Sequence, residues 1–230
     1  MEGQSSALAP SSWRSSKWLA LLEFAIVGFI FVAREHHLVP FSTTPFLLLL
    51  GWISLRVRNI AWKNMGFERY GSWAITLAVG IASGVGLELF DLLGKQPLLV
   101  RLLGKQPDLS QFRPLTSNLK LALLGLVLIW TLAAFGEELV YRGYLMNRVA
   151  GLVANARVGW ILSLVLVSVL FGFAHAYQGI TGIVEEGSDG VLLGLMYLGC
   201  RRSLAVPIIA HGVCDTIDLL LIFFGKYPGM

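Results

Sequence analysis

Three pairs of side chains in the C-terminal half of the sequence have types and spacings that suit acid–base chemistry. The members of each pair are four residues apart, which puts both on one face of an α-helix. Each pair lies in or next to an apolar run, and a charge within a bilayer costs roughly 2.5–3.5 kcal/mol, so ionisable residues there are functional candidates by default. The pairs are Glu138 with Arg142, Phe171 with His175, and His211 with Asp215.

The first pair belongs to the segment "AAFGEELVYRGYL", which places two carboxylates side by side. Successive residues of an α-helix are about 100° apart, so Glu138 can pair with Arg142 while Glu137 points elsewhere. A carboxylate in a site of low dielectric constant holds a proton more readily than in water, as a general base requires. The alternative is that all three charges form an inert buried network or a hydrated helix end.

The two histidines differ in their sequence context. His175 ends an apolar run, where a histidine is more often an interfacial, hydrogen-bonded residue than a catalyst. His211 lies well inside a run, with Asp215 one turn away and Asp218 on nearly the same face. A His–Asp pair at this position can also join two helices or line a proton path.

Together, these residues fit two forms of hydrolysis. In one, Glu137 and a histidine activate water while the second His/Asp pair stabilises an oxyanion. In the other, Glu137, His175 and His211 bind a divalent metal such as zinc, with water in the open position. The sequence has no Gly-x-Ser-x-Gly elbow and no His-Glu-x-x-His motif, which argues against a rhomboid-like serine site at such an elbow and against an ordinary zincin.

The elements that must position these residues are membrane helices. Of the 230 residues, 56% are hydrophobic and only 14% charged, and the mean hydropathy is +0.71. This composition predicts an all-α, polytopic transmembrane helix bundle of about seven segments (6–8), of which the second and sixth are short. The apolar runs lie at about 18–33, 43–57, 72–94, 117–140, 156–176, 188–200 and 203–223.

No Pro/Gly/Ser-rich linker divides the chain, so we expect one membrane domain over residues 1–230, with a polar tail at 1–17 and a catalytic core at 117–223. Cys200 and Cys214 fall in apolar segments and indicate neither a disulfide framework nor a metal site. Basic residues between the runs account for the formal charge of +4, so no nucleic-acid partner is expected.

Charges in the connections predict the orientation. The basic connections oppose an acidic segment, "VEEGSD" at 184–189, which we expect to be a loop, and this places the N-terminus in the cytoplasm. Residues 95–120 are basic on the wrong side for that assignment. They include part of a repeat, "LLGKQP" at 92–97 and 102–107, predicted to lie in the interface with its lysines at the headgroups. Gly80 and Gly84 have the spacing of a close helix contact.

The motifs, in this order, resemble the CAAX protease and bacteriocin-processing (CPBP or Abi) family, also called type II CAAX prenyl endopeptidases. The resemblance covers about residues 117–223 and rests on Glu-Glu-x-x-x-Arg, Phe-x-x-x-His and His-x-x-x-Asn, the last ending here in Asp215. It implies an all-helical intramembrane protease in which Glu137 and His175 activate water, while His211 and Asp215 stabilise the oxyanion. An ionised Asp215 cannot donate a hydrogen bond, so it would be protonated or would orient His211.

The function expected is that of an intramembrane endopeptidase in the plasma membrane, acting on a membrane-associated, lipidated or small peptide such as a bacteriocin precursor. Glu138, Arg142 and Phe171 would support the site, and the need for a metal is left open. Two alternatives remain: a transporter whose buried Glu, His and Asp form a proton or ion path, and a non-catalytic immunity or scaffold protein. Convergence of Glu137, His175 and His211 is the observation that hydrolysis requires.

Overall fold

Each of the seven predicted apolar runs lies on a helix of the computed structural model, which describes residues 16–39 and 42–229. No β-strand occurs within these residues, so the all-α prediction is confirmed. Most of the polar tail predicted at 1–17 lies outside the described residues. The main helices are α1 (Lys17–Glu35), α2 (Thr44–Arg58), α3 (Trp73–Phe90), α4 (Gln96–Leu103), α5 (Leu119–Leu128), α6 (Asn147–Leu152), α7 (Ala156–Ala174), α8 (Gly179–Gly199) and α9 (Ala205–Phe223).

Polar residues cap the starts of several of these helices. Ser72 accepts a hydrogen bond from the backbone N–H of Ile75 at the start of α3, at 3.2 Å. Asn118 and Asn155 cap α5 and α7 in the same way. Since the first backbone N–H groups of a helix have no partner within it, these side chains fix where the apolar segments become helical.

Four helical segments are long and apolar enough to cross a membrane: Trp73–Leu103, Leu119–Leu152, Ala156–Ala174 and Ala205–Phe223. The first joins α3 to α4 through the π-helical turn η3 (Asp91–Lys95), and the second runs unbroken from α5 to α6. The remaining three predicted runs are helical but less suited to crossing, because α2 has 15 residues and α1 and α8 carry charges.

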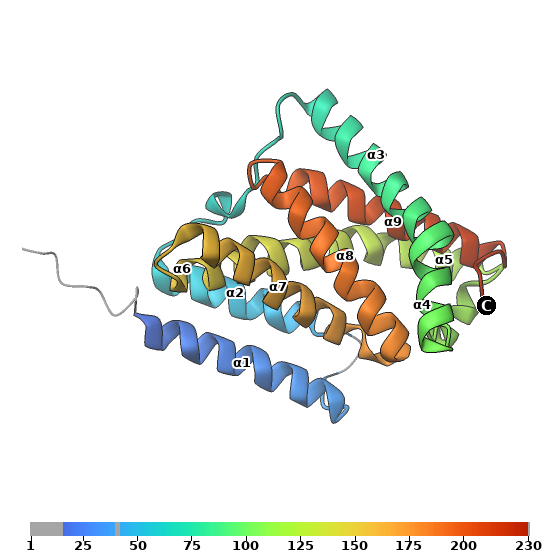
Figure 1. The fold of residues 1–230 in the computed structure, drawn as a ribbon, viewed down its shortest axis with the longest axis horizontal. Coiled ribbons are helices and arrows are strands. Elements are labelled where there is room, and N and C mark those ends of the chain that lie inside the picture. Colours follow the sequence, from blue (N-terminus) through green and yellow to red (C-terminus); the bar gives the residue numbers. More distant parts are fainter. Residues whose placement is uncertain (1–15, 40–41, 230) are drawn as a thin grey trace, which may run out of the picture.

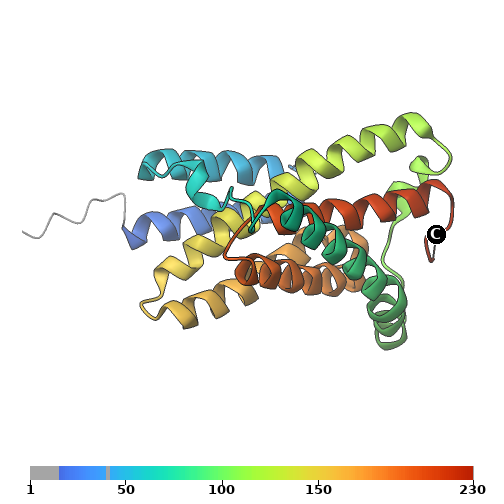
Figure 2. The same cartoon turned by 90° about the horizontal axis from the view of Figure 1, so that it is seen from above.

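The long segment Leu119–Leu152 lies at the centre of the bundle. Its middle portion contacts α2, α7 and α9. Helix α1 lies at one side of the molecule beside α2, whereas α3 packs along α9 at another side and α8 lies against both α7 and α9 (Figures 1 and 2). The three predicted motifs are therefore carried by helices that surround one region.

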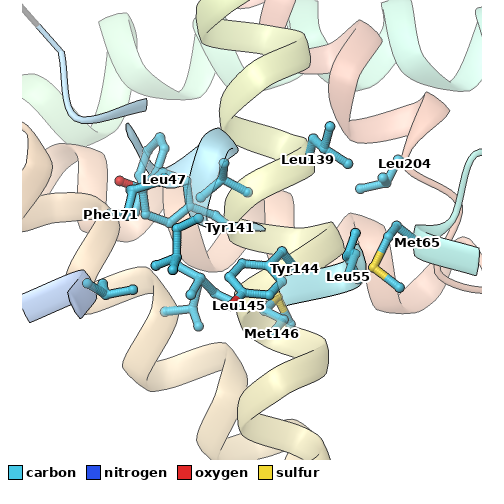
Figure 3. Packing of buried hydrophobic residues seen from close by; sticks show 14 of the residues in the cluster. Leu47, Leu55, Met65, Leu139, Tyr141, Tyr144, Leu145, Met146, Phe171 and Leu204 are labelled. Carbon is cyan, nitrogen blue, oxygen red and sulfur yellow. The ribbon is translucent and has the colours of Figure 1, made fainter. Parts of the chain in front are cut away.

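The best-packed region of the core surrounds η6 (Leu139–Met146), in which every residue is buried. Figure 3 shows Tyr141 beside Phe171 and Leu47, and their ring contact is edge-on with centroids 5.0 Å apart. Between membrane helices, close van der Waals packing supplies the attraction that hydrophobic burial supplies in water. The segment that carries the Glu-Glu-x-x-x-Arg motif is thus held on all sides.

The prediction that residues 184–189 form an acidic loop is wrong, because "VEEGSD" lies inside α8. Glu185 and Asp189 are buried there, and Lys95 forms ion pairs with Asp189 and, at 2.6 Å, with Asp91. Lys95 was expected at the headgroups, yet its side chain is only 7% exposed. Their charge predicted a loop, because the sequence does not show that Lys95, distant along the chain, pairs with Asp189 inside the bundle. The predicted orientation of the N-terminus is therefore no longer supported by an acidic loop at 184–189.

We expect Lys95→Met to lower the free energy of unfolding by about 3 kcal/mol, because two buried aspartates would lose their cation. This is the low end for a broken buried pair, since the aspartate side chains keep 12–13% exposure. The sequence repeat supplies the control: Lys105 is the equivalent lysine of the second "LLGKQP" copy and is exposed. Lys105→Met should change stability by less than about 0.5 kcal/mol. Thermal unfolding in detergent compares the two, and equal stabilities would contradict the structural role of Lys95.

The close contact predicted from Gly80 and Gly84 is confirmed. A Cβ atom at Gly80 would lie 2.7 Å from the Cβ of Ile209, and one at Gly84 would lie 2.5 Å from the backbone oxygen of Ala210. Both neighbours belong to α9. Because a backbone oxygen cannot move aside as a flexible side chain can, Gly84 sets how closely α3 approaches α9.

Gly84→Ala should destabilise the protein by about 1–3 kcal/mol through overpacking against α9. Gly86 lies two residues further along the same helix, and a Cβ there would meet no atom within 4 Å. Gly86→Ala should therefore leave stability unchanged or raise it, since alanine is the better helix former. Unfolding midpoints of both variants, measured in one detergent, test the contact, and a tolerated Gly84→Ala would show that the helices can separate freely.

Candidate active site

The Glu-Glu-x-x-x-Arg motif lies on π-helical turns, where the sequence had predicted an α-helix. The turns are η5 (Ile129–Glu137) and η6 (Leu139–Met146). In a π-helix each backbone hydrogen bond spans five residues instead of four, and such turns are frequent at functional sites. The spacing of 100° per residue that was used to separate Glu137 from Glu138 therefore does not apply, because an apolar run does not reveal how tightly its helix is wound.

The predicted pairing of Glu138 with Arg142 is confirmed. Arg142 Nη1 donates to Glu138 Oε1 at 2.7 Å, and the two side chains are 1% and 0% exposed. The guanidinium also donates from Nη2 to the backbone oxygen of Gly190 at 3.1 Å and lies 4.7 Å above the Phe171 ring. Arg142 thus joins the motif helix to α7 and α8 and neutralises Glu138.

His211 lies between two carboxylates. Its Nδ1 is 3.0 Å from Glu138 Oε1, and its Nε2 is 3.5 Å from Asp215 Oδ2. The sequence predicted the Asp215 contact from its spacing but missed the Glu138 contact, which crosses from α9 to the central helix. Glu138 therefore contacts both Arg142 and His211, whereas the sequence predicted only its ion pair with Arg142.

His175 caps the C-terminal end of α7. Its Nδ1 lies 3.0 Å from the backbone oxygen of Phe171. Because a carbonyl oxygen only accepts, Nδ1 carries the proton, and in the neutral ring Nε2 is left as the acceptor. The Phe171 ring lies near both histidines, with its centroid 4.9 Å from that of His175 and 6.2 Å from that of His211.

Glu137 is held by a residue from the N-terminal half of the chain. Thr44 Oγ1 donates to Glu137 Oε1 at 3.1 Å. The other oxygen, Oε2, is buried and accepts no hydrogen bond from the described residues, which leaves it available to water or substrate. Glu137 interacts electrostatically with both His175 and His211, although no direct hydrogen bond joins it to either of them within the described residues.

The metal-dependent alternative required Glu137, His175 and His211 to form one ligand set. Within the part of the chain that the structure describes, no three His, Cys, Asp or Glu side chains are arranged to hold a metal ion. Glu137, His175 and His211 therefore do not form such a ligand set in this structure.

Thr44 is the contact residue that the sequence reasoning missed. A signal was present, because Ser42, Thr43 and Thr44 lie at the start of the apolar run at 43–57, and hydroxyl residues at such a position often serve a helix start. That signal indicates a cap and gives no sign of a contact with Glu137. Asp218, noted for its position near the His211 face, interacts instead with Glu88 of α3.

The fold and the motif contacts thus describe a helical membrane protein with a buried Glu/His site. Residues 119–217 match the family model described as type II CAAX prenyl endopeptidase Rce1-like. The match covers less than half of the chain and agrees with the resemblance drawn from the motifs. A search of curated proteins and a search of solved structures each found no match.

This match supports a CAAX-type intramembrane protease in general, and thus a hydrolase. Together with the four helices long and apolar enough to span a bilayer, it also supports an integral membrane protein. The match includes Glu137, His175 and His211 and excludes Thr44.

Proposed function

We propose that the chain is an intramembrane endopeptidase that hydrolyses a peptide bond of a membrane-associated, lipidated or small peptide substrate. The observation that carries this proposal is the placement of Glu137: Thr44 holds one oxygen, the other accepts no hydrogen bond from the described residues, and the charges of His175 and His211 act on the carboxylate. A carboxylate with one free oxygen beside two imidazoles suits the activation of water.

In the proposed mechanism, Glu137 Oε2 takes a proton from water while the water oxygen attacks the carbonyl carbon of the scissile bond. His175 Nε2, left as an acceptor by the bond from Nδ1 to Phe171, helps to orient the same water. Glu137 then passes its proton to the nitrogen as the C–N bond breaks, which gives a carboxylic acid and an amine.

His211 is proposed as the donor to the oxyanion of the tetrahedral intermediate. Its Nδ1 is hydrogen-bonded to Glu138 at 3.0 Å, whereas the 3.5 Å between Nε2 and Asp215 Oδ2 is too long for a strong hydrogen bond, so Nε2 is the proposed donor. Asp215 then acts by orienting His211 and by placing a negative charge beside it. Aspartate can therefore serve at this position, where the family motif has asparagine. Phe171 packs near both histidine rings, and the positive charge of Arg142 neutralises the charge of Glu138.

The direct test is cleavage by the purified protein in liposomes. A peptide ending in a CAAX sequence is supplied with and without a prenyl group on its cysteine, and the products are identified by mass spectrometry in ¹⁸O-labelled water. Hydrolysis of the peptide bond places ¹⁸O from the water in the new carboxyl group. Prenyl-dependent cleavage supports a lipidated substrate, and cleavage of both peptides supports a broader specificity. Absence of any cleavage across CAAX and bacteriocin-precursor peptides would sink the proposal.

A transporter is the alternative with an observation in its favour, because a second set of buried charges, with Lys95 paired to Asp91 and Asp189, lies on η3 and α8. The same liposomes distinguish it by proton or ion flux that Glu137→Gln removes without any proteolysis. Full biological function in a triple variant of Glu137, His175 and His211 would favour the immunity or scaffold role.

We place the protein in the plasma membrane with its N-terminus in the cytoplasm, on the basis of the basic residues between its apolar runs. A tag at the N-terminus should resist protease added outside intact cells and be cleaved after permeabilisation. Digestion of the tag on intact cells would reverse the orientation.

A further inference from the structure

A hydrogen bond joins α2 to the carboxylate on which the proposed function rests. Thr44 is the first residue of α2, is 1% exposed, and lies outside the region that matches the family model. Its Oγ1 donates to Glu137 Oε1 at 3.1 Å. The N-terminal half of the chain therefore reaches the site by a specific polar contact.

The direction of this bond is fixed by a second hydroxyl group. Ser42 Oγ donates to Thr44 Oγ1 at 3.0 Å, and the backbone N–H of Thr44 donates back to Ser42 Oγ at 3.1 Å. A threonine hydroxyl has one proton, so a Thr44 oxygen that accepts from Ser42 commits its own proton to Glu137. Hydrogen bonds arranged in such a chain polarise one another, which strengthens the last one.

The carbon atoms of Thr44 are also held in place. A Cβ at Gly136 would lie 3.1 Å from Thr44 Cγ2, so the methyl group rests against the backbone of the residue before Glu137. Threonine is branched at Cβ, and fixing its methyl group also fixes its hydroxyl group. The missing side chain at Gly136 thus allows α2 to come close enough for the bond.

From these contacts we propose that Thr44 is a positioning residue for Glu137. A carboxylate turns easily about its last side-chain bond, and a hydrogen bond to Oε1 sets the plane in which Oε2 lies. With Oε1 held, the position of Oε2, the oxygen proposed to take the proton from water, is fixed as well. The catalytic consequence rests on the proposed function, whereas the contact itself does not.

The kinetic test compares two substitutions of Thr44. Thr44→Val keeps the shape and removes the hydroxyl group, and it should lower kcat about tenfold or more, with KM changed less than about twofold. Thr44→Ser keeps the hydroxyl group and should retain kcat within about threefold. The control is Thr76→Val, which removes an equally buried hydroxyl group whose acceptors are backbone oxygens of Tyr70 and Ser72. If Thr44 had only a structural role, Thr44→Ser would not restore kcat while KM stayed unchanged.

A second measurement is independent of proteolysis. Thermal unfolding in detergent of Thr44→Val, Glu137→Ala and the double variant forms a double-mutant cycle. We expect non-additive midpoints, with the double variant less destabilised than the sum of the single ones. Additive midpoints overturn the contact, and coupling with a wild-type kcat in Thr44→Val overturns the positioning role. Coupling in a protein that cleaves none of the peptides overturns the proposed function and the catalytic role of Thr44 with it.

Discussion

Glu137→Gln should lower kcat by about 10²–10⁴-fold, the contribution typical of a positioned general base. Glutamine has the same shape, and its amide oxygen can still accept from Thr44, so the helix contacts should persist. The amide cannot take a proton from water, and this removes the step on which attack depends. The measurement is single-turnover cleavage of whichever peptide the wild-type protein hydrolyses, at saturating protein.

The control for this variant is Glu35→Gln, the same chemical change at an exposed position near the end of α1. It should leave cleavage unchanged. Both variants should show the wild-type unfolding midpoint within a few degrees, which separates lost chemistry from lost structure. Cleavage by Glu137→Gln at the wild-type rate would mean that another residue activates the water.

Arg142→Met should be the most destabilising of the substitutions considered, at about 5 kcal/mol, the upper end for breaking a buried ion pair. Glu138 is 0% exposed and would be left without its guanidinium partner. The variant would also lose the hydrogen bond to Gly190 and the contact with the Phe171 ring. We expect little folded protein in the membrane fraction and a much lower unfolding midpoint in detergent for what remains.

A compensating variant separates charge from packing. Glu138→Gln combined with Arg142→Met removes both charges and should recover part of the lost stability, because no buried charge is left unpaired. Arg157→Met, at an exposed position near the start of α7, should behave as the wild-type protein does. If Arg142→Met alone unfolds at the wild-type temperature, the Glu138–Arg142 pair does not hold the central helix in place.

Much of the fold could be predicted because apolar runs and helices have the same cause in a membrane, where every backbone group must be paired within its own segment. Contacts between residues of the same helix could be predicted equally well. The four-residue spacing gave Glu138 with Arg142 and His211 with Asp215. The Gly80–Gly84 spacing indicated a close helix contact but did not identify α9 as the partner.

Contacts between helices could not be derived in this way. The bond from Thr44 to Glu137 and the contact of His211 with Glu138 join segments whose relative rotation no local pattern encodes. The start of α8 was missed for a related reason, since its acids read as a loop until Lys95 is placed beside them. The π-helical winding around Glu137 was missed because it leaves the apolar run unchanged.

The ion pair of Lys95 with Asp189 also has a consequence for biogenesis. Each unpaired charge costs roughly 2.5–3.5 kcal/mol at the centre of a bilayer, so α8, with Glu185, Glu186 and Asp189, is a poor substrate for insertion by itself. Lys95 is synthesised first and lies within the segment Trp73–Leu103, which is long and apolar enough to cross a membrane. We therefore expect α3 and α4 to insert first. Lys95 is then already in the membrane when α8 is made, and its pairing with Asp189 lowers the cost of inserting α8.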